Sequence, residues 1–441
     1  MEKKINNYQI SNERLYLRSH NINVCFRVII DGTFNKSYIE ESLKKLYIRH
    51  PLLKYSVDID DENNAWLVQK NDLINIEYYN SNEIDWQRWY KKNQNVEFDF
   101  FHGALVKFCV IMGENTEIIV FGHHIIGDGM GYLILTKDFL LALDNRIEEI
   151  PQIPPFETKE KYFKKTVPLN IFEKIYARSF NKKWRKSQVK FLEKDYSVFF
   201  EQYKNKYIPN IFMNSIEGND VKNIMEKSKA SGLSVNELIV SAFSMAIMKF
   251  FNQNKIRLGV AASIRNELVS EPNNCMGNFV TGITLEANYN KLKDFISNAK
   301  KTAVALRNKL ENIKKRHLVV HFLNEIDKDL IESIMFAVYG LFDNPVSKKL
   351  AKLIGVQTAR KSLGISNLGR HDFNGYNNFK VNDIQFIGPS FPSHLLTLDV
   401  ITINEKMNIC LIFNESEIII ENIKKIYEKG IELLIHGKNA S

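Results

Sequence analysis

Two adjacent histidines, His123 and His124, are the residues of this chain best placed for acid–base chemistry. They follow a β-forming run at residues 117–122 and precede a turn that contains Asp128 and Gly129. A strand holds its last residues rigidly, so an imidazole fixed there can take a proton from a substrate in a cleft. Successive strand side chains point to opposite faces, so only one of the two histidines can line that cleft. The pattern predicts a general base.

Asp128 lies four residues after His124, in a turn made tight by two glycines. Its carboxylate can bind a nearby arginine and lock the turn that presents the imidazole. Three other interpretations stand beside this one. His123 fits a buried core histidine. A metal shared by His124 and Asp128 lacks a third ligand nearby, so no metal site is expected. A serine hydrolase is disfavoured because the chain has no G-x-S-x-G elbow.

The surrounding sequence alternates strand and helix patterns. Four of the ten prolines lie between residues 151 and 168, which indicates a linker. We therefore predict a mixed α/β protein with lobes at residues 1–150 and 171–441 and a linker at 151–170. The capping boxes Ser37-x-x-Glu40 and Ser234-x-x-Glu237 are expected to open two of its helices. Strands are expected near 24–31, 105–112, 117–122, 256–261, 280–286, 381–387, 395–403 and 407–413. Helices are expected near 39–50, 131–145, from about 220, near 234–251 and near 417–434, with a long helical zone that ends at about 353.

Composition excludes several classes of protein. The 441 residues are 44% hydrophobic and 25% charged, which is typical of a globular chain and unlike a disordered or fibrous one. The four cysteines are far apart in the sequence, so neither a disulfide scaffold nor a zinc finger is expected. No apolar run fits a secretory signal or an integral membrane segment. We expect a cytoplasmic monomer.

The net charge of +9 is concentrated in one segment. Residues 159–206 carry 14 Lys or Arg and 5 Asp or Glu, and the rest of the chain is neutral. Interleaved aromatic residues predict an amphipathic helix, whose basic face contains Lys182, Lys183, Arg185 and Lys186. This face is either an ordinary solvated surface or a docking face for an anionic partner, such as a nucleotide-like cofactor, an acidic protein or a lipid surface.

The double-histidine stretch resembles the His-His-x-x-x-Asp-Gly motif of the thioester-dependent acyltransferases. That superfamily includes chloramphenicol acetyltransferase, alcohol acetyltransferases and the condensation domains of nonribosomal peptide synthetases. Lys54 and Ala104 depart from the usual Arg and Pro of the flanking motifs. The resemblance runs from residue 11 to about 413, and its supporting segments are residues 11–16, 49–54, 98–107, 263–266, 276–280 and 366–369.

The resemblance implies two chloramphenicol-acetyltransferase-like lobes in a V shape around a central channel. His124 would be the general base, and Gly129 would border the pantetheine arm of the donor. Asp128 would be structural and paired with an arginine, for which Arg14, Arg49 and Arg265 are the candidates. Candidates for oxyanion or substrate contacts are Ser366, Asn367 and Asn278, although a turn or helix-cap role fits the first two equally well.

The implied reaction is acyl transfer from a pantetheine thioester to a hydroxyl or amine of a small molecule, as in specialised metabolism or lipid ester formation. The donor is expected in trans, as acyl-CoA or on an acidic acyl or peptidyl carrier protein, with no bound cofactor. The basic face would then be the docking face for the CoA phosphates or the acidic carrier protein. Two alternatives stay open: a stand-alone condensation enzyme that forms an amide with a carrier-bound acyl or aminoacyl group, and a non-catalytic module that binds a carrier protein. Nucleic acid is not an expected partner, because no nucleic-acid-binding motif accompanies the basic charge.

Overall fold

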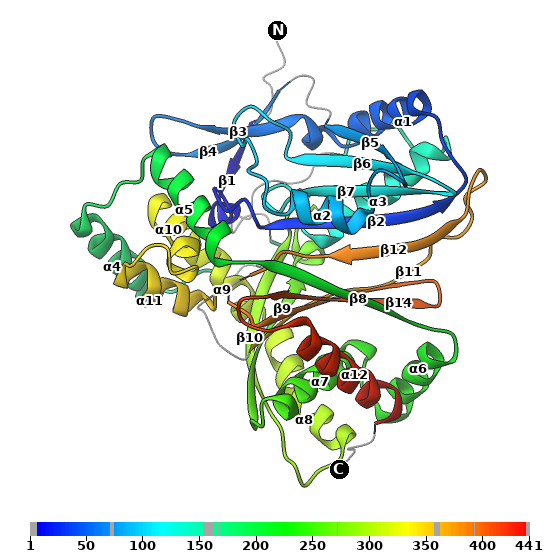
Figure 1. The fold of residues 1–441 in the computed structure, drawn as a ribbon. Helices are drawn as coiled ribbons and strands as arrows, with labels where there is room; N and C mark the ends of the chain where they lie inside the picture. Colours follow the sequence, from blue (N-terminus) through cyan, green and yellow to red (C-terminus); the bar gives the residue numbers. More distant parts are fainter. Residues whose placement is uncertain are drawn as a thin grey trace.

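The computed structural model describes residues 7–70, 75–152, 163–165, 167–270, 272–356, 362–391 and 393–437. Within these residues the strands form three sheets, and Figure 1 shows the two larger ones in separate layers of the molecule. The mixture of helices and strands confirms the predicted α/β class.

The N-terminal lobe is built on a five-stranded sheet with the order β12-β2-β7-β6-β5. Helices α1 (Lys36–Arg49) and α3 (Gly129–Leu143) pack against each other, and α3 contacts β2 of the sheet. A smaller sheet, β1-β4-β3, adjoins it. The strands of this lobe are β1 (Tyr8–Ile10), β2 (Asn23–Asp31), β3 (Tyr55–Ile59), β4 (Ala65–Gln69), β5 (Ile76–Asn80), β6 (Val106–Met112) and β7 (Asn115–His123), and its further helices are η1 (Asn12–Leu15), η2 (Pro51–Lys54) and α2 (Trp86–Asn93).

One strand crosses between the lobes. β12 (Val381–Ile387) belongs to the C-terminal half of the sequence, yet it pairs antiparallel with β2 at the edge of the N-terminal sheet. β12 lies within residues 171–441, which the sequence assigned to the C-terminal lobe, but it pairs in the N-terminal sheet. The crossing places the chain that follows β12 directly beside the N-terminal lobe, where the cavity described below is found.

The C-terminal lobe is built on a six-stranded sheet with the order β10-β9-β11-β13-β14-β8. One face packs on helices α7, α8 and α12, and the apolar side chains of that interface form the second core of the molecule. β8 was not predicted, because its partly exposed residues lack a clear alternation. The elements are β8 (Pro209–Glu217), α6 (Asn219–Ser231), α7 (Val235–Phe250), β9 (Lys255–Ser263), η4 (Arg265–Glu267), β10 (Val280–Asn288), α8 (Phe295–Leu310), β11 (Ser362–His371), β13 (Leu396–Ile403), β14 (Lys406–Asn414) and α12 (Ile420–His436).

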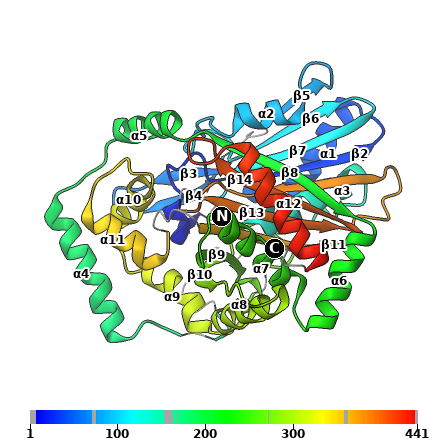
Figure 2. The same cartoon turned by 60° about the horizontal axis from the view of Figure 1, so that its bottom comes forward.

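Five further helices form a group at one side of the molecule, on the left in Figures 1 and 2. They enclose a third apolar cluster, which includes Trp184 and Phe322. Most of the predicted linker, residues 153–162 and 166, lies outside the described residues; Phe163 forms an isolated bridge with Leu268. The helices are α4 (Ile171–Ser187), α5 (Glu193–Lys206), α9 (Ile313–Leu323), α10 (Lys328–Val338) and α11 (Pro345–Ile354).

Two predicted helix starts can be compared with the structure. The Ser234 capping box is confirmed, since its side chain accepts from the Glu237 amide and Glu237 reciprocates. The Ser37 box is wrong: Asn35 is the N-cap of α1, because its side chain accepts from the Tyr38 amide while Ser37 donates to Asn35. No single helix in the described part of the chain is long and apolar enough to cross a membrane.

Candidate active site

The two histidines lie at the end of β7 and face opposite sides, as the strand pattern predicted. The His123 side chain is fully buried among Phe98 and Phe100, and its Nε2 lies 2.9 Å from the Ser19 carbonyl oxygen. Burial lowers its pKa to about 3, so the ring is neutral at physiological pH. His123 is therefore a core residue whose polar atoms are satisfied within the N-terminal lobe.

His124 instead lines a cavity of about 280 Å³, although its side chain is only 6% exposed. Its backbone amide donates to the Ile22 carbonyl at 2.9 Å, and its ring centroid lies 5.0 Å from that of Tyr16. Burial lowers its pKa, while the Asp128 charge and a hydrogen bond to its own carbonyl act in the opposite direction. A neutral imidazole in a cavity wall is the state that a general base requires.

Asp128 holds the turn after His124 with both of its oxygens. It is the N-cap of α3, where Oδ1 accepts from the Gly131 amide at 2.7 Å. The same oxygen accepts from Arg265 Nη2 at 2.8 Å, and Oδ2 accepts from the Phe279 amide at 2.8 Å. Arg265 and Phe279 belong to the C-terminal lobe. Asp128 therefore fixes the histidine turn to the opposite lobe rather than only to its own helix.

Of the three candidate arginines, Arg265 is the partner of Asp128, and both side chains are buried. Its guanidinium also donates to the carbonyls of Pro272, Cys275 and Gly277, which define the course of the following loop. Arg14 and Arg49 lie elsewhere. Arg14 pairs with Glu332 at 2.7 Å, and Arg49 pairs with Asp138 at 3.2 Å.

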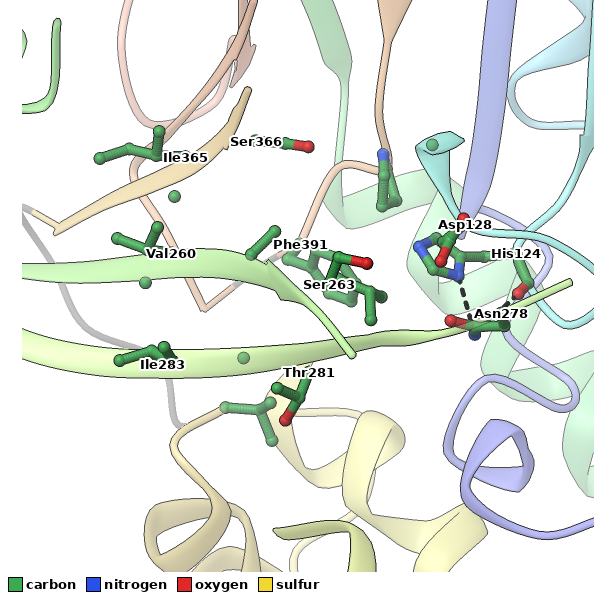
Figure 3. Close-up of a pocket in the computed structure, with 18 of the residues that line it drawn as sticks. His124, Asp128, Val260, Ser263, Asn278, Thr281, Ile283, Ile365, Ser366 and Phe391 are labelled. Carbon is green, nitrogen blue, oxygen red and sulfur yellow. Dashed lines mark hydrogen bonds between the residues drawn. The ribbon is translucent and has the colours of Figure 1, made fainter. Parts of the chain in front are cut away.

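The loop held by Arg265 presents Asn278 to His124. The Asn278 Nδ2 atom lies 3.1 Å from His124 Nδ1 and 3.1 Å from the His124 carbonyl oxygen. Figure 3 shows both contacts as dashed lines, with the opposite edge of the imidazole turned toward the cavity. The preceding Gly277 has φ +154, and a Cβ there would lie 2.4 Å from the Phe279 ring. Glycine thus permits the close approach of this loop.

The wall of the cavity is formed largely by small residues of the C-terminal sheet. Gly259 pairs with Gly364, and Ala261 pairs with Gly282, so these two cross-strand pairs carry almost no side-chain bulk. The space above Gly282 is open, since a Cβ there would meet nothing within 4 Å, whereas the His394 ring covers Gly259 and Gly364. Figure 3 shows the cavity extending from His124 past Ser263 toward the labelled β-sheet residues. Among the described residues that line the cavity, the charged ones are acidic and none is a lysine or arginine.

The other candidate residues of the motifs lie in the wall of the cavity. Gly129, Ser366, Asn367 and Asn278 all line the cavity. A Cβ on Gly129 would lie 3.0 Å from Leu368 and 3.1 Å from Phe386, so glycine is needed there for packing between the lobes. The Asn367 amide donates to Asn236 at 3.1 Å, and its oxygen caps the turn at Gly369. The Ser366 hydroxyl has no partner among the described residues.

The basic residues predicted to dock a donor lie on α4, outside the cavity lining. Lys182, Lys183 and Lys186 are exposed, whereas Arg185 is held by Asp327 at 2.7 and 2.8 Å. α4 packs on α9 and α11, and these two helices contribute Val320 and Ile354 to the cavity wall. The basic face thus lies on the outer side of helices that enclose the cavity.

Sequence reasoning missed three polar residues of the cavity. Glu13 lies in η1, and burial raises its pKa to about 7. Asp399 accepts from the Gly388 amide at 2.7 Å, and burial raises its pKa to about 8. His394 lies over Gly259, where a Cβ would come within 2.2 Å of its Nε2. The described residues contain no group of three or more His, Cys, Asp or Glu side chains that could hold a metal ion.

Comparison with known protein families matches the sequence of this chain to one of them. The profile of the condensation domain matches residues 11–315. Bacitracin synthase 2 of Bacillus licheniformis is 21% identical over 266 residues, which are 56% of this chain and 10% of the synthase. The chain thus spans about a tenth of the length of this curated relative.

Solved structures agree on the fold. The trichothecene 15-O-acetyltransferase of Fusarium sporotrichioides superimposes with a TM-score of 0.69 and 12% identity, over 98% of this chain and 95% of that one. The epimerization domain from the third module of tyrocidine synthetase B gives a TM-score of 0.65 and 15% identity, over 99% of this chain and 97% of that domain. These likenesses confirm the two-lobed fold. With the profile covering more than half of its length, the chain belongs to the condensation-domain family.

Proposed function

We propose that this protein transfers an acyl group from a pantetheine thioester to a hydroxyl or amine of a small molecule, with His124 as the general base. One observation carries the proposal: His124 is the histidine of the motif that reaches the cavity, and burial keeps its imidazole neutral. The fixed turn at Asp128 and the apolar surroundings satisfy the other requirements of a positioned base.

In the proposed reaction, His124 takes the proton of the acceptor as its oxygen or nitrogen attacks the thioester carbon. The new bond converts the carbonyl into a tetrahedral oxyanion, and the Ser366 hydroxyl is the donor we assign to it. Collapse of the intermediate breaks the carbon–sulfur bond. The imidazolium then returns the proton to the departing thiolate, so His124 ends the cycle neutral and the products are an ester or amide and a free thiol.

The charge distribution supports a donor whose uncharged end enters the cavity while its anionic end stays outside. The described lining lacks lysine and arginine, so these residues offer no counter-charge to phosphates. The uncharged pantetheine arm and acyl group fit there, while the anionic part of acyl-CoA or of a carrier protein stays outside. The exposed lysines of α4 are the docking face we propose for that part.

The test of the base is intact-mass screening of acyl-CoAs and acyl carrier proteins with pooled alcohols and amines. The wild-type protein should give an acylated product, and His124→Ala should lose turnover by about a thousandfold or more while it melts normally. His102→Ala is a matched control, since that imidazole is 82% exposed and lies outside the cavity lining. Undiminished activity of His124→Ala would refute the assignment.

The docking face is tested by reversing charge at Lys182, Lys183 and Lys186. If donors dock there, the donor KM should rise, and added salt should reduce the difference from wild type because it screens exposed charges. Reversal of Lys222 and Lys229 on α6 is the control, since these lysines are also exposed. An equal effect of both reversals would remove α4 from the proposal.

A second candidate is amide formation with a carrier-bound acyl or aminoacyl group. The match to bacitracin synthase 2 favours it, because the similarity to a peptide synthase is detectable at the sequence level. The same screen separates the two functions: an amide formed only with carrier-bound partners would replace free small-molecule acylation. A chain that binds a carrier protein and acylates nothing would instead be a non-catalytic module.

A further inference from the structure

His394 is an imidazole of the main cavity that the proposed reaction does not use. Its ring lies across two neighbouring strands, over Gly259 of β9 and Gly364 of β11. A Cβ on Gly259 would lie 2.2 Å from the ring Nε2, and a Cβ on Gly364 would lie 3.0 Å from its Cδ2. Because the two glycines pair in register, they leave a gap in the side chains of the sheet that the imidazole occupies. Glycine weakens a strand interior, so this pair indicates that the position of the ring matters.

The two nitrogens of the His394 ring have different surroundings. Nδ1 lies 2.8 Å from the Ser393 hydroxyl, which can donate to it or accept from it. Nε2 has no hydrogen-bond partner among the described residues, and the side chain is partly exposed and lines the cavity. Burial and the positive charge of Arg257 lower the pKa of His394 to about 4. The ring is therefore neutral at physiological pH and presents one free nitrogen, which donates or accepts according to how the Ser393 hydroxyl is turned.

Thr284 supplies a second free hydrogen-bonding group beside this nitrogen. It pairs directly with Gly259 across β9 and β10, so its side chain lies on the same face of the sheet as the imidazole. Opposite Cβ positions in such a pair are about 4.5 to 5.5 Å apart. The His394 Nε2 atom lies near the Cβ position of Gly259. Thr284 also lines the cavity, and its hydroxyl has no partner within the described part of the chain. A single small group between the two side chains can therefore bond to both.

The two side chains lie at a distance from His124 that β10 measures. Asn278 contacts His124, and the chain runs from Asn278 through Val280 and Gly282 to Thr284. At roughly 3.3 Å per strand residue, Thr284 is about 13 Å from Val280 and about 20 Å from Asn278. The position between them is open, because a Cβ on Gly282 would meet nothing within 4 Å. An extended alkyl chain of roughly 10 to 16 bonds spans this distance, at about 1.2 Å per bond.

We propose that His394 and Thr284 form a subsite that binds a hydroxyl group of the substrate, carried by a chain whose other end lies at His124. A hydroxyl donates and accepts through one atom, so it can bond to the imidazole and to the threonine together. An anionic group does not fit, because the ring is neutral and Arg257 lies outside the described lining, where it donates to the Gly355 carbonyl at 2.6 Å. The subsite rests on the proposed function, since it takes the cavity to be the place where the substrate binds.

The test measures binding without turnover, by isothermal titration calorimetry. One pair of probes is a linear alcohol and the matching terminal diol, of about 10 to 14 carbons, which represent an acceptor. The other pair is a fatty acyl pantetheine thioester with and without a hydroxyl at the end of the acyl chain, which represents the donor. His394→Phe keeps an aromatic ring over the glycines but removes both nitrogens. In one of the two pairs it should lower the preference for the hydroxylated probe by about fivefold, the equivalent of one hydrogen bond, and that pair identifies the substrate that carries the hydroxyl.

Thr284→Val removes only the second hydroxyl partner and should lower the same preference, which keeps the test decisive if His394→Phe does not fold. His102→Phe is the control, because that imidazole is exposed and lies outside the cavity lining. A merely structural role of His394 would weaken both probes of a pair equally and leave their ratio unchanged. An unchanged ratio in both pairs, in either folded variant, would overturn the subsite. His124→Ala should keep the preference, so failure of the proposed base and failure of the subsite are distinguishable.

Discussion

Replacement of Asp128 by Asn should lower stability and activity together, because one carboxylate holds both lobes at the histidine turn. Asp128 accepts three hydrogen bonds of 2.7 to 2.8 Å, and its ion-pair partner Arg265 is equally buried. The substitution leaves the Arg265 charge without a counter-ion, a change that costs about 3 to 5 kcal/mol when a buried pair is broken. The Asn nitrogen also faces a donor, the Phe279 or Gly131 amide. We expect a loss near the lower end of that range, about 3 kcal/mol, since one acceptor oxygen remains.

The measurement is the free energy of unfolding in urea, with turnover recorded below the unfolding transition. Asp144→Asn is a matched control: Asp144 is also buried, pairs with Arg146 at 3.0 Å and accepts from the Asn377 amide at 2.9 Å, but does not line the cavity. It should lose stability while keeping its activity. A second variant, Arg265→Met combined with Asp128→Asn, should recover part of the stability because no buried charge remains alone. An Asp128→Asn protein that lost activity but unfolded like wild type would refute the structural role.

Three further outcomes follow from the site. The pH profile of kcat/KM should fall on its acid side with an apparent pKa below the ordinary histidine value, because burial lowers the pKa of His124. An apparent pKa at or above the ordinary value contradicts a buried neutral base. His123 stays neutral to about pH 3 while the unfolded chain takes up a proton, so its contribution to stability should fall as pH decreases from about 6.5, by at most about 1.4 kcal/mol per pH unit for this one residue. Urea titrations of His123→Gln should show a shallower fall. A Cβ on Gly282 meets nothing within 4 Å, so Gly282→Leu should fold normally and exclude long acyl groups in a chain-length screen. Gly259→Ala should instead lose about 1 to 3 kcal/mol on thermal unfolding, because it displaces His394.

The sequence predicted the parts of this molecule that depend on local pattern. The strand pattern at 117–122 correctly indicated that only one of the two histidines lines the cavity, and the choice of His124 came from the family resemblance. The strands near 381–387 and 407–413 were also predicted, because short apolar runs between turn residues have few other structures available. The start of α1 was misplaced because Asn35 and Ser37 are both good caps, and only the backbone geometry decides between them.

Features set by long-range contact were not predictable in the same way. Arg265 lies 137 positions from Asp128, and three arginines were equal candidates until the lobes were assembled. The residues of β12 likewise do not indicate which sheet the strand joins, since an apolar strand fits either lobe. The sequence could not predict the role of Glu13 or Asp399 in the cavity, because their pKa values are raised by burial and burial depends on the assembled fold.

The separation of charge within the molecule constrains how any donor can be used. The positive charge lies in residues 159–206, whereas the described lining of the cavity has no basic side chain. An anionic group drawn into that cavity would lose its water without gaining a counter-charge, which is costly in an apolar site. If the proposed function is right, we expect the group that enters to be neutral and the anionic end of the donor to be recognised at the surface. It follows that substitutions in the cavity should change which acyl groups are accepted, while substitutions on α4 should change how tightly the donor as a whole binds.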